Sequence, residues 1–129
     1  WYYPSGKSAM YYSMFAATSH GPTVPDARVP LILWLQGGPG ASSQFGAFTE
    51  NGPIRITKDR IYEFGQSWNI MGHMVFIDQP LGVGFSYTTD KTKPLVSSAR
   101  QAADHLLNFL SNLYKQWPAL KTSPLYITG

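Results

Sequence analysis

Apolar residues gather in three short continuous runs, separated by segments rich in glycine, proline and polar residues. The runs are Leu31–Leu35, Met74–Ile77 and Leu125–Thr128. A short run that is apolar at consecutive positions is typical of a strand buried on both faces of a mixed or parallel sheet. A further strand is predicted at Ser8–Thr18, where aromatic residues recur before the proline-rich loop Ser19–Pro30.

The clearest helix is predicted between the last two runs. Apolar residues recur there at steps of three and four, which places them on one helical face: Ala99, Ala103, Leu106, Leu110, Leu113 and Trp117. Ser98 and Gln101 form a capping-box pattern at its start, and Pro118 ends it. A shorter helix is predicted to begin at Ser42 or Ser43 and to run to Glu50.

A buried strand followed by a turn, a helix and another buried strand is typical of α/β proteins. The sequence therefore predicts an α/β fold, with a mixed sheet flanked by helices. The few predicted helices give little cover to the two faces of such a sheet, and the last strand lies next to Gly129. We therefore expect the chain to be part of a larger domain and to fold poorly alone.

Composition narrows the function classes. The chain has 129 residues, enough for one domain, and its net charge of +3 comes from scattered lysines and arginines in no nucleic-acid motif. No apolar run approaches the ~18 residues of a membrane span. There are no cysteines, and His20, His73 and His105 lack ligand spacing, so we expect no metal or other cofactor. Each histidine is expected at the surface or half-buried.

Gln36–Ser43 (QGGPGASS) lies directly between a predicted strand and a predicted helix. Its glycines let the backbone bend sharply, and amide groups in such a turn can converge on an anion. A phosphate cradle is disfavoured, because neither phosphate-binding glycine spacing is present and Pro39 has no amide proton. An oxyanion hole needs only one or two amides. The motif alone supports a functional turn and a purely structural one equally, and Glu50 alone indicates a solvated helix end.

Several segments together resemble the serine carboxypeptidase family of α/β-hydrolases. They are Trp34–Gly40 (WLQGGPG), Glu50–Pro53 (ENGP), Ser67–Asn69 (SWN), Phe76–Tyr87 (FIDQPLGVGFSY) and Leu125–Gly129 (LYITG). The matches follow the family's order over nearly the whole chain, which is far more specific than any one of them. The glutamine within WLQGGPG resembles the vitellogenic-like and retinoid-inducible branch.

The resemblance implies that residues 1–129 are the N-terminal portion of a single α/β-hydrolase domain. Leu125–Gly129 is similar to the strand that leads into the family's G-E-S-Y-A-G, so the chain is expected to stop before the nucleophilic serine and to be inactive alone. The whole protein is expected to release C-terminal amino acids from peptides by acyl transfer from serine to water.

The resemblance also assigns roles to residues of this chain. The Gly38 amide is expected to be one oxyanion donor. The substrate's C-terminal carboxylate is expected to meet Gln36, the Gly37 amide and Glu50, and recognition through carboxyl groups should favour acidic pH. Phe45 and Thr49 are expected to line the pocket for the leaving residue.

Other polar residues receive no catalytic role. Asp78 follows the predicted strand Met74–Ile77 and is either a triad acid or an acceptor for loop amides. The second is favoured, because the acid follows the nucleophile in α/β-hydrolases. Three serines could be considered as nucleophiles, but none of them stands in G-x-S-x-G. They are Ser42, Ser43 and Ser86.

Two positions depart from the pattern of many members. Gln36 stands where many have asparagine, and Ala41 stands where many have a bridged cysteine. The expected partners are peptides with a free C-terminus, with no nucleic acid and no membrane, and the resemblance implies a homodimer in the secretory pathway, secreted or in a lysosome or vacuole. One alternative is a carboxypeptidase-like acyltransferase, which Glu50 disfavours; another is a non-catalytic pseudoenzyme or fragment.

Overall fold

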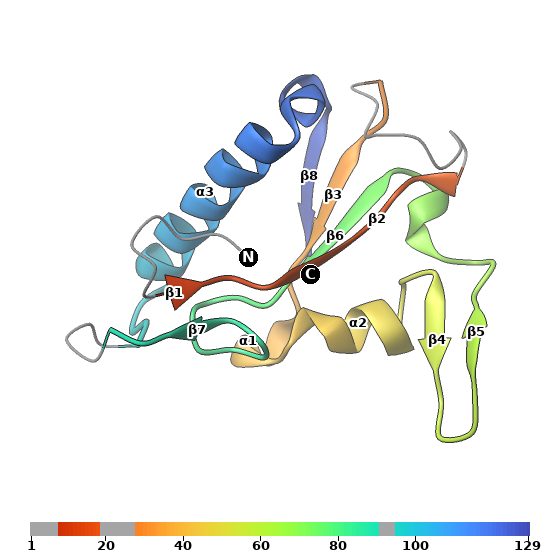
Figure 1. Cartoon of the computed structure of the whole chain (residues 1–129), viewed down its shortest axis with the longest axis horizontal. Helices are drawn as coiled ribbons and strands as arrows, with labels where there is room; N and C mark the ends of the chain where they lie inside the picture. The colour runs from red at the N-terminus through yellow and green to blue at the C-terminus, as the bar shows by residue number, and fades with distance from the viewer. Residues whose placement is uncertain (1–7, 19–27, 91–94) are drawn as a thin grey trace.

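The computed structural model describes residues 8–18, 28–90 and 95–129 (Figure 1). Its central sheet has the strand order β2-β6-β3-β8. The strands are β2 (Tyr12–Phe15), β6 (His73–Ile77), β3 (Leu31–Trp34) and β8 (Leu125–Thr128). β3 runs parallel to both of its neighbours, whereas β2 is antiparallel to β6. The predicted mixed sheet is therefore confirmed.

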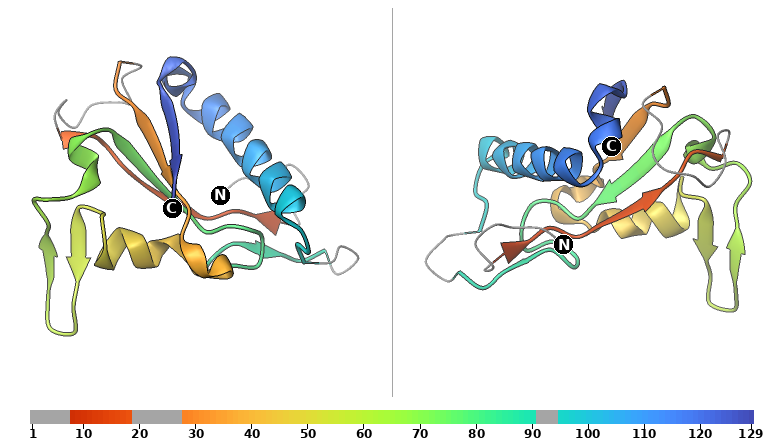
Figure 2. Two further views of the ribbon diagram at one scale, coloured as in Figure 1. Left: turned by 180° about the vertical axis from the view of Figure 1, so that it is seen from behind. Right: turned by 45° about the horizontal axis from the view of Figure 1, so that its top comes forward.

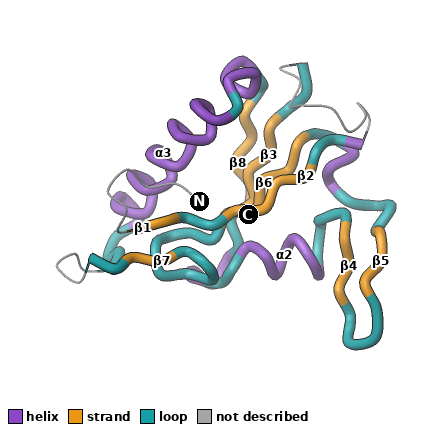
Figure 3. The backbone as a smooth tube through the Cα atoms, in the orientation of Figure 1, coloured by secondary structure: helices purple, strands orange, loops and turns teal. Residues whose placement is uncertain are grey.

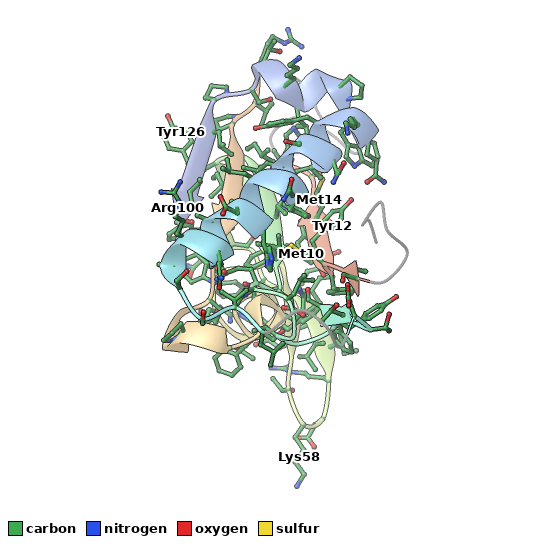
Figure 4. The ribbon with its side chains drawn as sticks, turned by 90° about the vertical axis from the view of Figure 1, so that its left-hand side faces the viewer. Met10, Tyr12, Met14, Lys58, Arg100 and Tyr126 are labelled. Atoms are coloured by element: carbon green, nitrogen blue, oxygen red, sulfur yellow. The ribbon has the colours of Figure 1, made fainter. Side chains whose placement is uncertain are left out.

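Two helices lie on opposite sides of these strands (Figure 2). Because side chains alternate along a strand, Leu31 and Leu33 face α3 (Ala99–Gln116), whereas Ile32 faces α2 (Ser43–Thr49). Met10, Tyr12 and Met14 also lie on the α3 side (Figure 4). The apolar runs at β3 and β6 are buried on both faces, as predicted.

Helix α3 begins and ends as predicted. The Ser98 hydroxyl accepts a hydrogen bond from the Gln101 amide at 3.3 Å, while the Gln101 side chain accepts one from the Ser97 amide at 2.9 Å. The Gln101 side chain thus bonds the amide of Ser97, the residue before the N-cap, and not the amide of Ser98 itself. Leu110 and Leu113 are buried together with Phe109, which was not in the predicted face, whereas Ala99 and Ala103 are exposed. Partial burial of Tyr114 on the same helix raises the pKa of its phenol.

The predicted strand Ser8–Thr18 is wrong as one element. It forms β1 (Ser8–Ala9), which pairs with β7 (Tyr87–Thr88), and then β2, which pairs with β6. Between the two, the Tyr11 amide donates to the Ser86 hydroxyl at 2.8 Å instead of joining a ladder. The chain changes partner at this point.

The burial predicted for Leu125–Thr128 is also wrong. Tyr126 and Ile127 are 56% and 53% exposed, and Tyr126 projects outward from β8 (Figure 4). The reason is that β8 pairs with β3 along one edge, while α3 packs over β3 and β6. Within the part of the chain that the structure describes, β8 is an edge strand.

An unpredicted hairpin follows α2. Its strands, β4 (Ile54–Ile56) and β5 (Ile61–Glu63), are antiparallel and stand apart from the central strands (Figure 3). Short 3-10 turns at Trp68–Ile70 and Pro118–Thr122 complete the described elements. The hairpin connects the end of α2 to the start of the buried strand β6.

Candidate active site

The glycine turn lies between β3 and α2, where Figure 1 labels Gly37–Gly40 as α1. Gly38 has φ +137° and Gly40 has φ +96°, in the region that favours glycine, so this backbone path needs glycine at both positions. The backbone of the turn is exposed. At its start, the Gln36 amide donates to the Ser43 hydroxyl at 3.1 Å. The turn therefore presents peptide groups to solvent from an anchored base.

Gln36 and Glu50 meet at one side of this turn. The Gln36 side-chain amide donates to the two Glu50 carboxylate oxygens at 3.3 and 3.4 Å. Its oxygen accepts a hydrogen bond from the Trp34 indole at 2.8 Å. The indole therefore decides which end of the amide faces Glu50. Two residues predicted to share a substrate-binding role are in contact.

Glu50 is the residue that caps the C-terminal end of α2, and its side chain is exposed. Its backbone carbonyl accepts a hydrogen bond from the Arg55 guanidinium. Arg55 also lies over the Phe64 ring, 4.0 Å from its centroid. Glu50 thus lies between the glycine turn and the β4–β5 hairpin, with its carboxylate open to solvent.

Gly46 allows this arrangement. A Cβ atom at Gly46 would lie 2.6 Å from both the Gln36 side-chain oxygen and the Trp34 indole nitrogen. No real side chain fits there unless those groups move. Sequence reasoning assigned no role in the site to either Gly46 or Trp34. The available signal was a glycine inside a predicted helix, where glycine is less favourable than alanine by about 1 kcal/mol.

Phe45 and Thr49 lie one helical turn apart on α2, and both are exposed. The Thr49 hydroxyl donates to the Phe45 carbonyl at 2.6 Å, and the Phe45 side chain is 58% exposed. Successive helical residues are about 100° apart, so Phe45 and Thr49 share one face of α2, next to the face that carries Gly46. Their role in the pocket for the leaving residue stays a prediction.

Asp78 and the serines have structural partners. Asp78 is fully buried, and its carboxylate accepts hydrogen bonds from the Phe85 amide at 2.9 Å and the Ser42 hydroxyl at 2.6 Å. The favoured reading of Asp78 as an acceptor in its loop is confirmed. The Ser43 hydroxyl donates to the Ile77 carbonyl at 2.5 Å, and the Ser86 hydroxyl donates to the Asp78 carbonyl at 2.6 Å.

The histidines differ in their placement. His20 lies outside the described residues, and His105 is half-buried on α3. His73 is buried at the start of β6, where its Nδ1 accepts a hydrogen bond from the Ala17 amide at 3.1 Å. The prediction that His73 lies at the surface or half-buried is therefore wrong, because this ring satisfies a buried backbone donor. Across residues 8–18, 28–90 and 95–129, no side chains cluster as metal ligands.

The same described ranges contain no helix with the length and apolar character of a membrane span. What they do contain is an exposed turn of peptide amides beside an amide–carboxyl pair. Amide N–H groups are donors and therefore suit an anion. The arrangement can therefore hold a carboxylate next to a turn that can stabilise a developing oxyanion.

A protein-family model with the description "Serine carboxypeptidase" matches residues 2–129 of this chain. The chain is 37% identical to serine carboxypeptidase-like 50 of Arabidopsis thaliana over 98% of this chain and 28% of that protein. It is 39% identical to the vitellogenic carboxypeptidase of Aedes aegypti, over 79% of this chain and 22% of that protein. The chain thus spans about a quarter of the length of these relatives.

A solved structure gives the same answer for the fold. The crystal structure of Kex1(delta)p, a prohormone-processing carboxypeptidase of Saccharomyces cerevisiae, has a TM-score of 0.70 and 29% identity. The match covers 96% of this chain and 31% of the yeast chain. The predicted fold class, an α/β-hydrolase with a mixed sheet flanked by helices, is confirmed.

Proposed function

Because this chain belongs to the serine carboxypeptidase family, we propose that it is the N-terminal portion, residues 1–129, of a protein that releases C-terminal amino acids from peptides. The observation that carries the proposal is the contact between Gln36 and Glu50 beside the Gly37–Gly38 turn. This contact supports the proposal, because an amide and a carboxyl side chain beside backbone amides suit a substrate with a terminal carboxylate and a developing oxyanion.

Each part has a role in acyl transfer. A serine elsewhere in the whole protein attacks the carbonyl of the last peptide bond, and the Gly38 amide stabilises the oxygen as it becomes negative. The leaving amino acid carries the peptide's terminal carboxylate. Gln36, the Gly37 amide and Glu50 hold that carboxylate, so the enzyme selects the last bond of the peptide.

The side-chain contacts favour a peptide over a sugar ester. An ester substrate without a free carboxylate offers no anion for Gln36 and Glu50, and the pair would then have no function in substrate binding. The exposed ring of Phe45 is a suitable apolar wall for the side chain of the leaving residue.

We place the whole protein in the secretory pathway, secreted or in a lysosome or vacuole. The yeast protein of known structure is described as prohormone-processing, and the similarity to it supports the proposed compartment. The proposed substrates of the whole protein are peptides with a free C-terminus.

The test compares a free-terminus peptide with its amidated counterpart, using the whole protein. We expect release of the last amino acid from the free peptide at acidic pH and much slower cleavage of the amide. Stoichiometric labelling by a fluorophosphonate probe should accompany this activity. Acyl transfer to an alcohol without peptide hydrolysis would identify an acyltransferase, and the absence of labelling would identify a non-catalytic protein.

A further inference from the structure

The buried carboxylate of Asp78 joins two loops at the C-terminal end of the sheet. Asp78 follows β6, and its side chain is 0% exposed. One oxygen accepts from the Ser42 hydroxyl at 2.6 Å, and the other accepts from the Phe85 amide at 2.9 Å. Ser42 belongs to the glycine turn's far end, and Phe85 belongs to the loop after β6. A single carboxylate thus holds both segments.

The loop after β6 is shaped around this carboxylate. Gly84 has φ +55°, and a Cβ atom there would lie 2.1 Å from the second carboxylate oxygen and 2.9 Å from the Ser42 hydroxyl. The three groups therefore meet at one point, and only glycine fits. A buried carboxylate is unfavourable unless it is well hydrogen-bonded, and removing a donor leaves its oxygen uncompensated.

Ser42 passes this constraint to the glycine turn. Its hydroxyl donates to Asp78 and accepts from the Gln44 amide at 3.2 Å. The same oxygen therefore caps α2 and holds Ser42, at the end of the glycine turn, in place. At the other end of the turn, the Ser43 hydroxyl links the Gln36 amide to the Ile77 carbonyl. Both ends are therefore attached to the end of β6, one to its last residue, Ile77, and the other to Asp78, which follows it.

Between these two attachments, residues Gly37–Ala41 carry no polar side chain that could hold the turn. Gly38 and Gly40 have no side chains, and both adopt positive φ. The direction of the exposed Gly38 amide therefore depends on where the two ends are placed. The attachment at Ser43 is made by backbone groups and one hydroxyl, whereas the attachment at Ser42 depends on the side chain of Asp78.

We propose that Asp78 is a positioning residue, which acts through Ser42 to fix the direction of the Gly38 amide. The inference rests on the proposed function, in which that amide stabilises the oxyanion. Loss of the link should lower kcat for every substrate, because the oxyanion forms whether or not the peptide ends in a free carboxylate. KM should change less than kcat, because two of the three groups that hold the carboxylate, the side chains of Gln36 and Glu50, do not depend on this link.

The experiment compares Ser42→Ala with Ser86→Ala in the whole protein. Each change removes one hydroxyl that donates to Asp78, but Ser86 donates to its backbone carbonyl and accepts from the Tyr11 amide. The two variants should lose similar melting temperature. Only Ser42→Ala should lower kcat, by roughly 10- to 100-fold, equally for a free-terminus peptide and a blocked ester.

Two further variants keep the test decisive. Ser42→Thr retains the hydroxyl and should restore most of the lost kcat. Asp78→Asn retains the shape, and its side-chain amide can donate to the Ser42 oxygen in place of the bond that is lost, so it should keep more kcat than Ser42→Ala. Equal kcat values for Ser42→Ala and Ser86→Ala in an active protein would overturn the positioning role alone. An inactive wild-type protein would overturn the proposed function and this inference together.

Discussion

The side-chain amide of Gln36 donates to both carboxylate oxygens of Glu50 across 14 residues of chain, at 3.3 and 3.4 Å. The amide presents its nitrogen to Glu50 because its oxygen is taken by the Trp34 indole. An amide held in this way has a defined N–H direction at the edge of an exposed glycine turn.

Replacing Glu50 in the whole protein should affect substrates according to their terminus. Glu50→Ala should lower kcat/KM for a free-terminus peptide by ~1–3 kcal/mol, or roughly 5- to 150-fold, because a hydrogen bond to the carboxylate is lost. Glu50→Gln keeps a neutral donor and should preserve activity best at acidic pH. Steady-state kinetics on the peptide and on its blocked counterpart provide the measurement. Equal losses on both substrates would contradict carboxylate recognition.

Replacing Trp34 should act on Gln36. Trp34→Phe keeps an aromatic ring next to Trp68, whose centroid lies 5.5 Å away, but removes the indole donor. The Gln36 amide is then free to rotate, and kcat/KM for free-terminus peptides should fall roughly fivefold, the equivalent of one hydrogen bond of about 1 kcal/mol. Blocked esters serve as the control substrate. An unchanged ratio between the two substrates would show that the indole does not orient the amide.

Adding one methyl group at Gly46 should disturb the same pair. Alanine normally stabilises a helix relative to glycine, but the Cβ of Gly46→Ala would lie 2.6 Å from Gln36 and Trp34. We expect a loss of about 1–3 kcal/mol in unfolding free energy, together with weaker binding of free-terminus peptides. Denaturant unfolding and KM measure the two effects. Gly65→Ala is the matched control, since nothing lies within 4 Å of a Cβ there.

The 129-residue chain alone should not react with a fluorophosphonate probe. The Ser42 and Ser86 hydroxyls donate to Asp78, and the Ser43 hydroxyl donates to a backbone carbonyl. None of these three is hydrogen-bonded to a histidine that could act as its base. Intact-mass spectrometry after incubation is the measurement, with the whole protein as positive control. Stoichiometric labelling of any serine in the isolated chain would contradict the assignment.

The isolated chain should also lack a cooperative thermal transition. Leu125, Tyr126 and Ile127 on the edge strand β8 are exposed, and an exposed apolar edge favours self-association over a stable monomer. Circular dichroism on heating, together with size-exclusion chromatography, measures both properties. A sharp transition in a monomeric sample would show that the core around Leu33 and Leu113 is sufficient.

The strands β3 and β6 and the helix α3 could be predicted because each has a local pattern: a continuous apolar run or an apolar face with a serine cap. The exposure of Ile127 could not be, because burial depends on what covers a strand rather than on its own residues. The β4–β5 hairpin was missed, since both of its isoleucine-bearing strands are only three residues long.

The candidate site was predicted mostly through resemblance. Local pattern identified the glycine turn, but by itself it indicated a solvated Glu50. The contact with Gln36 depends on a close approach at Gly46, which no periodicity reveals. Asp78 was read correctly as a loop acceptor, whereas its bond to Ser42 needed the placement of α2 against the end of β6.

The position of β3 between two strands that follow it in the chain has a consequence for the order of assembly. The Gln36–Glu50 pair closes a loop of 14 residues, whereas the Thr128 hydroxyl reaches the Leu33 carbonyl across 95. Loop closure of the longer segment is less favourable by about 1.7 kcal/mol in chain entropy. As the polypeptide leaves the ribosome, the contact between Gln36 and Glu50 can therefore form while the strand that completes this part of the sheet is still being synthesised.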